Sequence, residues 1–177
     1  MKKFEFTGET KQVELLFRTA TLHRIKAVAE FGIVKVGDLG GWIEKEENLS
    51  HDGKAWVYGD AKVWGDAKVW GNAEVCGDAK VYGDAKVWGN AKVCGDAEVF
   101  SISHVLVIGP IGSRNDFTTF FRDKDSEITV KCGCFLGKID KFLEKVCETH
   151  GDSKYAIVYR TAAEIAKQQI DLSEEKQ

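Results

Sequence analysis

The sequence predicts a mainly β fold in which the central part of the chain coils as a solenoid, with a small module at each end. A six-residue motif, Ala-Lys-Val-(aromatic or Cys)-Gly-(Asp or Asn), recurs with few changes eight times between Ala55 and Phe100. A short, constant period indicates identical structural units that stack on one another. Four alternating residues and a two-residue corner fit a period of six, whereas a helix of period 3.6 drifts against it.

Each repeat predicts one short strand followed by a corner. In Ala61-Lys62-Val63-Trp64, small and β-branched residues alternate with charged and aromatic ones, as in a strand with one buried face. Gly65-Asp66 then supplies the corner, because glycine adopts dihedrals closed to other residues and aspartate can bond the nearby backbone. A chain that turns in the same direction at every corner forms a coil.

The repeat resembles the hexapeptide-repeat family of left-handed β-helices, in which a buried aliphatic residue is followed four residues later by a small one, as Val63 is by Ala67. In that family three hexads make one triangular turn of about 18 residues. The resemblance therefore implies three faces on which strands one turn apart are stacked. The chain departs from the family at the residue after the aliphatic one, which is often small there and is Trp, Tyr, Phe or Cys here.

The segment before the repeat predicts a cap, because the end of a solenoid exposes a hydrophobic edge that must be covered. Residues 1–35 predict an N-terminal β cap of two or three antiparallel strands, with a turn at Thr7–Thr10. A helix around Ile25–Phe31 is the competing interpretation, because Ala27 and Ala29 favour it.

The solenoid itself is expected over residues 36–103, since the segment between the cap and the repeats is close to one coil long. We expect this segment to form an irregular first turn with Leu39, Ile43 and Leu49 inside.

Residues 104–177 predict a C-terminal α+β module, because the repeat stops there and the composition changes. Three strands are expected, followed by two helices. The strands are expected at His104–Gly109, Phe117–Arg122 and Ile128–Cys132. Apolar stripes predict the helices: Ile139, Phe142, Leu143 and Val146 before a stop at Gly151, then Tyr155, Val158, Tyr159, Ala162, Ile165 and Ala166.

Composition excludes some classes of function. The net charge of −3 argues against bulk binding of nucleic acid. No apolar run is long enough for a membrane span, and the N-terminus lacks the pattern of a signal peptide. Five cysteines without framework spacing suit a reducing compartment, so we expect a cytoplasmic protein without membrane contact.

The residue after each valine sorts into three columns if three hexads complete a turn. Two columns are aromatic and one is not. The first holds Trp64, Tyr82 and Phe100, the second Trp70 and Trp88, and the third Tyr58, Cys76 and Cys94. Lys68 and Lys86 accompany the second column, as Lys62 and Lys80 accompany the first.

Three interpretations of the aromatic columns remain open. Stacking within a sheet needs no partner. Self-association, which we expect, would bury aromatic faces that soluble monomers seldom leave open. A homo-trimer is the favoured assembly, because it would bury two faces that share a corner. A ligand platform would use Trp64, Trp70, Tyr82 and Trp88 to stack a base while Lys68 and Lys86 hold its phosphate.

A second group of candidate binding residues lies beyond the repeat. Gly109-Pro-Ile-Gly-Ser-Arg114 offers amide groups, Ser113 and Arg114 to an anion, and Arg122 is expected on a neighbouring strand. A plain hairpin connection is the simpler interpretation, because the Gly-Lys-Ser/Thr ending of a phosphate-binding loop is missing.

Metal sites are expected to be absent, with two alternatives. Cys132, Cys134, Cys147 and His150 have spacings that could close a structural zinc site, or they are buried small residues and part of a helix stripe. Stacked corner aspartates could hold Ca²⁺ between coils, although such residues more often bond the turn backbone and pair with lysine. No cofactor is expected.

An enzyme must be weighed, because the resemblance implies a fold that hosts acyltransferases and a class of zinc carbonic anhydrases. Both need histidine as a general base or as metal ligands. Residues 52–103 contain none, and only His51 and His104 flank the repeat. We therefore expect a non-enzymatic protein, with an acyltransferase and a structural scaffold as the alternatives.

The whole chain resembles uncharacterised hexapeptide-repeat proteins of bacteriophages and prophages. Five segments carry this resemblance: Gly37-Asp-Leu-Gly-Gly-Trp-Ile-Glu44, Glu47-Asn-Leu-Ser50, Thr118-Thr-Phe-Phe-Arg122, Cys132-Gly-Cys-Phe135 and Glu148-Thr-His-Gly-Asp152. The resemblance implies a non-essential phage accessory protein and no particular activity. Because phage accessory genes often encode inhibitors of host defence, we expect this protein to inhibit a defence factor in the host cytoplasm, by binding a host protein or by sequestering a nucleotide signal.

Overall fold

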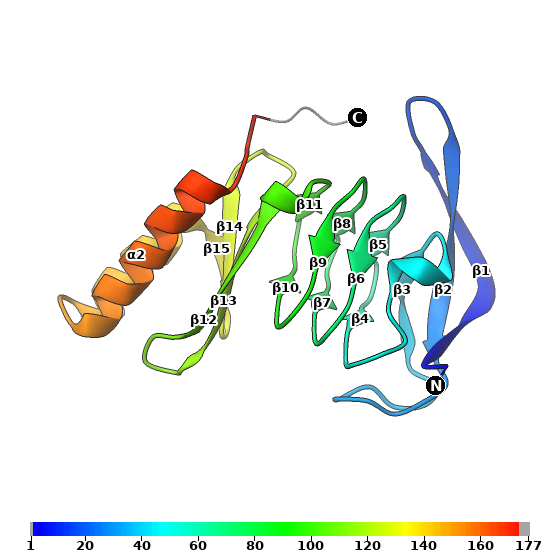
Figure 1. Ribbon diagram of the computed structural model, residues 1–177, viewed down its shortest axis with the longest axis horizontal. Coiled ribbons are helices and arrows are strands. Elements are labelled where there is room, and N and C mark those ends of the chain that lie inside the picture. Colours follow the sequence, from blue (N-terminus) through cyan, green and yellow to red (C-terminus); the bar gives the residue numbers. More distant parts are fainter. Residues whose placement is uncertain (1, 174–177) are drawn as a thin grey trace.

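The central part of the chain is a β-solenoid of about three turns (Figure 1). The computed structural model describes residues 2–173. Each repeat contributes a two-residue strand. These strands are β4 (Trp56–Val57), β5 (Lys62–Val63), β6 (Lys68–Val69), β7 (Glu74–Val75), β8 (Lys80–Val81), β9 (Lys86–Val87), β10 (Lys92–Val93) and β11 (Glu98–Val99).

The strands pair in parallel with those one turn away, so that Val63 lies beside Val81 and Val69 beside Val87. This confirms the register of 18 residues. The solenoid has three faces. The first face carries β5, β8 and β11, the second face β6 and β9, and the third face β4, β7 and β10.

Alanine and valine fill the interior of the solenoid. Each repeat valine and each repeat alanine is at most 1% exposed. The corners need glycine: the φ of Gly71 is +73°, and a Cβ there would lie 3.1 Å from the amide nitrogen of Gly89 in the next coil. The repeated glycine thus permits both the corner and the close stacking of coils.

An antiparallel hairpin caps the N-terminal end, as expected. It consists of β1 (Phe4–Glu14) and β2 (Thr19–Ala27). The turn expected at Thr7–Thr10 is wrong, because β1 runs through it with a register shift, and Gly8 has a φ of +93°. The helix considered around Ile25–Phe31 does not form.

The hairpin continues the first face. β2 pairs antiparallel with β3 (Leu39–Ile43), and β3 pairs parallel with β5. The resulting sheet has the order β1-β2-β3-β5-β8-β11. The first sheet therefore runs from the cap along the whole solenoid.

The irregular first turn buries two of the three residues expected inside it. Ile43 and Leu49 are at most 1% exposed, whereas Leu39 is 51% exposed, so its assignment to the interior is wrong. The 3-10 helix η1 (Glu46–Asn48) stands in this turn. The buried amide of Asn48 donates to the carbonyl oxygens of Gly65 and Ala67, which fixes the turn on the next coil.

A four-stranded antiparallel sheet closes the other end, where three strands were expected. After the 3-10 helix η2 (Ile102–His104), the strands are β12 (Val105–Ile111), β13 (Asp116–Arg122), β14 (Ile128–Cys132) and β15 (Phe135–Lys138). β13 packs on both sides: Phe121 joins the solenoid core, and Phe120 joins the core formed with the helices. Alternation along one strand thus joins the solenoid to the module.

Two helices, α1 (Ile139–His150) and α2 (Lys154–Gln169), cover the outer side of this sheet (Figure 1). α1 ends at Gly151 as expected, with a φ of +54°. The stripe expected on α2 is partly wrong: Tyr155, Val158 and Ile165 are exposed, and alanines on the adjacent face pack inside instead. Neither helix within residues 2–173 is long and apolar enough to cross a bilayer.

Candidate functional site

The first aromatic column is covered by the chain itself. Trp64 and Tyr82 stack with ring centroids 4.5 Å apart, and Tyr82 stacks on Phe100 at 5.2 Å. Val13 and Leu15 of the hairpin pack on this column, and its three rings are at most 8% exposed. The expectation of two uncovered aromatic faces is therefore wrong, and so is the premise for a trimer that buries both.

Ion pairs anchor the hairpin over this column. Lys11 contacts Asp60 at 2.9 Å, and its ammonium lies 4.2 Å from the centroid of the Trp42 ring. Arg18 forms two hydrogen bonds to the Glu44 carboxylate, which also accepts from the Gly65 amide at 2.7 Å. Sequence reasoning did not predict that the hairpin covers this column. The only signal for this packing in the sequence was the apolar-rich segment from Val13 to Phe17.

The second aromatic column remains open to solvent. Trp70 and Trp88 stack with centroids 5.5 Å apart and planes 13° from parallel. Trp88 is 43% exposed. Beyond it, Ile102 at the end of the solenoid is 47% exposed and extends the apolar surface. We call Trp70, Trp88 and Ile102 the open face.

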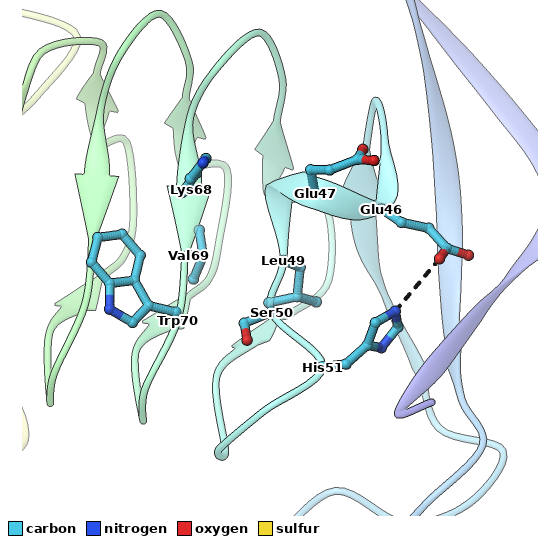
Figure 2. Close-up of a pocket in the computed structure, with 8 residues that line it drawn as sticks. All are labelled: Glu46, Glu47, Leu49, Ser50, His51, Lys68, Val69 and Trp70. Carbon is cyan, nitrogen blue, oxygen red and sulfur yellow. Dashed lines mark ion pairs between the residues drawn. The ribbon is translucent and has the colours of Figure 1, made fainter. Parts of the chain in front are cut away.

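Shallow cavities lie at both ends of the open face. One has a volume of about 420 Å³ and is lined by Trp70, Leu49, His51 and the glutamates of η1 (Figure 2). The other, also about 420 Å³, lies between Trp88, Ile102 and the apolar residues of β12. An apolar strip with a recess at each end offers anchoring points to a macromolecule.

Lysines border the open face. Lys68 and Lys86 lie on consecutive rungs, and neither forms an ion pair with a carboxylate of the described residues. The third face differs, because Glu74 and Lys92 lie on consecutive coils there and form an ion pair at 3.2 Å. The charge on the open face is thus available to an acidic partner.

The histidines beside the solenoid are engaged in structural contacts. His51 accepts the Lys3 amide hydrogen at Nδ1, so its proton is on Nε2, which lies 3.5 Å from Glu46 (Figure 2). Its ring also stacks on Phe4 at 4.3 Å. His104 is fully buried, and its Nδ1 accepts from the Phe100 amide. Neither ring nitrogen of His51 is available as a general base.

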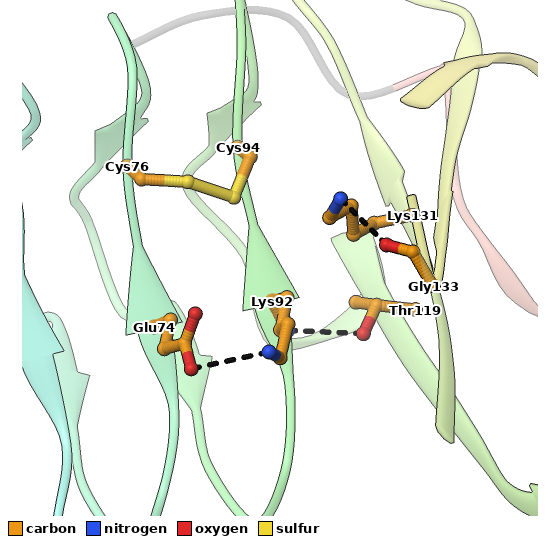
Figure 3. Close-up of a disulfide and its surroundings, with 7 residues drawn as sticks. All are labelled: Glu74, Cys76, Lys92, Cys94, Thr119, Lys131 and Gly133. Carbon is orange, nitrogen blue, oxygen red and sulfur yellow. Dashed lines mark hydrogen bonds and ion pairs between the residues drawn. A yellow bond between two sulfur atoms is a disulfide. The ribbon is translucent and has the colours of Figure 1, made fainter. Parts of the chain in front are cut away.

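The third face carries a disulfide between Cys76 and Cys94 on consecutive coils (Figure 3). Their stacking was expected from the column, but the expectation that all cysteines are reduced is wrong. Disulfides persist mainly in oxidising compartments, whereas a reducing cytoplasm would keep Cys76 and Cys94 as two neighbouring thiols.

The residues of the expected anion site are not brought together. Ser113 and Arg114 are exposed at one end of β13, and Arg122 is buried at the other end. The Arg122 guanidinium lies 4.7 Å from the Phe100 ring centroid and donates to Ser126 at 2.6 Å. Arg122 therefore joins the module to the solenoid.

The cysteine and histidine set does not form a ligand cluster in the described part of the chain. There, the ligand atoms of Asp123, Asp125 and Glu127 do gather closely. Lys138 contacts all three carboxylates, at 2.7, 3.4 and 2.6 Å respectively. Desolvation lowers the pKa of Lys138, but these contacts outweigh that effect and hold the pKa above its usual value, so the lysine ammonium lies where a cation would and offsets one of the three negative charges.

Comparison with known proteins matches no family to this chain, and no curated protein matches it either.

Proposed function

We propose that this chain is a non-enzymatic binding protein that docks a protein partner on the open face. The main evidence is that two equivalent aromatic columns differ in solvent exposure. The hairpin covers the first column, whereas Trp88 in the second column is 43% exposed. Contiguous exposed apolar surface of this kind marks interaction sites. Tryptophan is also among the residues that most often dominate binding energy.

The charge beside the open face indicates the chemistry of the partner. Lys68 and Lys86 would meet carboxylates at the rim of the contact, while Trp70 and Trp88 meet apolar side chains at its centre. A protein fits better than a nucleotide, because the two indole rings stack on each other and cannot sandwich a base between them.

The biological role belongs to the same proposal. The 18-residue register supports the hexapeptide-repeat resemblance and, with it, a left-handed winding. The resemblance to phage-encoded proteins points to a host defence factor as the partner. An acyltransferase is less well supported, because both ring nitrogens of His51 have partners.

Affinity capture from host lysate tests this proposal. We expect one host protein to be retained by the wild type and lost with Trp88→Ser. The matched control is Tyr155→Ser, which removes an aromatic ring of 36% exposure from α2 and should retain the partner. Retention by Trp88→Ser would contradict the proposal.

Two further measurements separate the other occupants. A thermal shift with a cyclic nucleotide that Trp88→Ser abolishes would assign the face to a nucleotide. In light scattering, a stable multiple of the 19.7 kDa chain mass that Trp88→Ser dissociates would assign it to a second copy.

A further inference from the structure

A separate cavity lies between the hairpin and the first face. Its volume is about 360 Å³. The hairpin contributes one wall from Gln12 to Leu15, and the solenoid contributes Lys62, Lys80, Trp64, Tyr82 and Glu98. The cavity and the open face lie on different sides of the solenoid, so either can bind without the other.

Anchors on both sides of the hairpin wall hold this cavity in shape. Lys11, directly before the wall, pairs with Asp60. Arg18, shortly after it, pairs with Glu44, which is itself held by the Gly65 amide. A ligand entering here would meet a preformed site and would have little chain to order.

Two lysines give the cavity its cationic side. Lys62 and Lys80 are direct neighbours in the parallel ladder, at a rung spacing of about 4.8 Å. Among residues 2–173 neither forms an ion pair with a carboxylate, whereas Lys11 of the hairpin and Lys45 and Lys92 of the solenoid do. Glu98 on the following rung and Glu14 on the hairpin wall carry the opposite charge, while the two adjacent lysines repel each other. An anion bound between the two lysines would offset that repulsion.

Aromatic and aliphatic groups give the cavity its apolar side. Trp64 and Tyr82 stack within 3° of parallel beside the lysines, and Val13 and Leu15 face them from the hairpin. Burial first, and then the neighbouring Glu98 carboxylate, raise the pKa of the Tyr82 hydroxyl, which stays protonated and donates to Glu98 at 3.5 Å. Only the edges of the two rings reach the cavity, because Trp64 and Tyr82 are 4% and 8% exposed beneath the hairpin.

We propose that this cavity binds a small organic anion, in which a phosphate or carboxylate group is attached to an apolar body the size of one ring. The anionic group contacts the ammonium groups of Lys62 and Lys80. The apolar body lies between Leu15 and the edges of Trp64 and Tyr82. The volume of about 360 Å³ accommodates one such ring and excludes large ligands.

Titration calorimetry with four probes tests this site. Phenyl phosphate and phenylacetate carry the two anionic groups on the same ring, phenol is the neutral comparison, and inorganic phosphate lacks the ring. We expect at least one phenyl anion to bind, and the two arms identify whether phosphate or carboxylate is preferred. Phenol and inorganic phosphate should each bind about tenfold more weakly or not at all.

Lysine variants locate the binding. Lys62→Gln and Lys80→Gln should each weaken the phenyl anion by about tenfold. Lys92→Gln makes the same change at the same repeat position on the third face, away from both proposed binding surfaces, and should leave the affinity unchanged. All three side chains lie on the solenoid surface, and an unchanged melting temperature would show that each variant is folded.

Several results would overturn the proposal. These are no binding of either phenyl anion, equal binding of phenol, equal binding of inorganic phosphate, or equal loss in the variants of both faces.

Discussion

Trp64 and Tyr82 occupy the same position on consecutive coils, and their rings stack with centroids 4.5 Å apart and planes 3° from parallel. Trp70 and Trp88 repeat this relationship on the second face, at 5.5 Å. The two pairs follow the same repeat motif and differ in what covers them. The hairpin closes over the first pair and leaves the second for a partner.

This difference predicts unequal effects of alanine substitution. Trp64→Ala should lower the free energy of unfolding by about 3–5 kcal/mol, because a buried aromatic ring is removed and a cavity is left. Trp88→Ala should cost about 1 kcal/mol or less, because Trp88 is already 43% exposed and its loss opens no interior cavity. Urea unfolding measures both values. Equal losses would contradict the assignment of covered and open columns.

The corner glycines predict a second comparison. Gly71 and Gly59 both have positive φ, of +73° and +60°, but only at Gly71 would a Cβ approach the next coil, at 3.1 Å. Gly59→Ala should therefore cost about 1–2 kcal/mol for its backbone conformation alone. Gly71→Ala should cost about 1 kcal/mol more, because coils must move apart. Denaturant midpoints of the two variants give the comparison, and a larger loss in Gly59→Ala would argue against this packing.

Much of the solenoid could be predicted from the sequence, because each repeat reports the same local environment. The alternation around Val63 and the corner at Gly65 together determine the strands, their stacking and the sorting of Trp64, Trp70 and Cys76 onto separate faces. A period of six leaves no freedom in the register once three hexads complete a turn.

The contacts outside the repeat could not be predicted in this way. The packing of Val13 and Leu15 on Trp64 joins segments about fifty residues apart, and no periodicity links them. Leu39 lies before the first repeat, so nothing in the sequence sets its orientation, and it is exposed. The open face was recognised as aromatic, but its exposure depended on where the hairpin folds.

The disulfide also shows which features could be predicted from the sequence and which could not. The columns placed Cys76 above Cys94, while composition alone argued for reduced cysteines. The positions of two particular cysteines are better evidence for a disulfide than the overall cysteine content, because a disulfide needs only two thiols that meet in an oxidising environment.

Reduction of this bond should lower stability by about 3 kcal/mol, because the bond closes a loop with a sequence separation of 18 in the unfolded chain. Thermal unfolding with and without reductant measures the effect, and Cys76→Ser should show no response to reductant. Alkylation of the folded chain should modify Cys132, Cys134 and Cys147 alone. An equal response of Cys76→Ser would contradict the prediction.

The buried side chain of Lys3 should make the stability of the protein depend on pH. The residue is 3% exposed, and its ammonium donates to the Ala55 carbonyl at 2.8 Å. Burial lowers the pKa of this ammonium from 10.5 to about 8, with Asp52 opposing the shift. In the unfolded chain Lys3 therefore binds its proton up to a higher pH than in the folded chain. The cost of burying the charge is fully present below pH 8 and is relieved as pH rises from about 8 to 10.5.

The measurement compares the wild type with Lys3→Met by denaturant unfolding across this interval. The stability of the wild type relative to the variant should increase as pH rises. A constant difference would show that the ammonium is not held in a desolvated environment, and a decreasing one would reverse the sign of the shift.

Photo-crosslinking from the open face tests the proposed function most directly. A photoreactive phenylalanine analogue replaces Trp88 in one variant and Tyr155 of α2 in the control, and both are irradiated in host lysate. We predict that position 88 yields one prominent adduct with a host protein and that position 155 does not. Adducts from position 155 alone, or adducts from position 88 only with the chain itself, would contradict the assignment of the open face to a host partner.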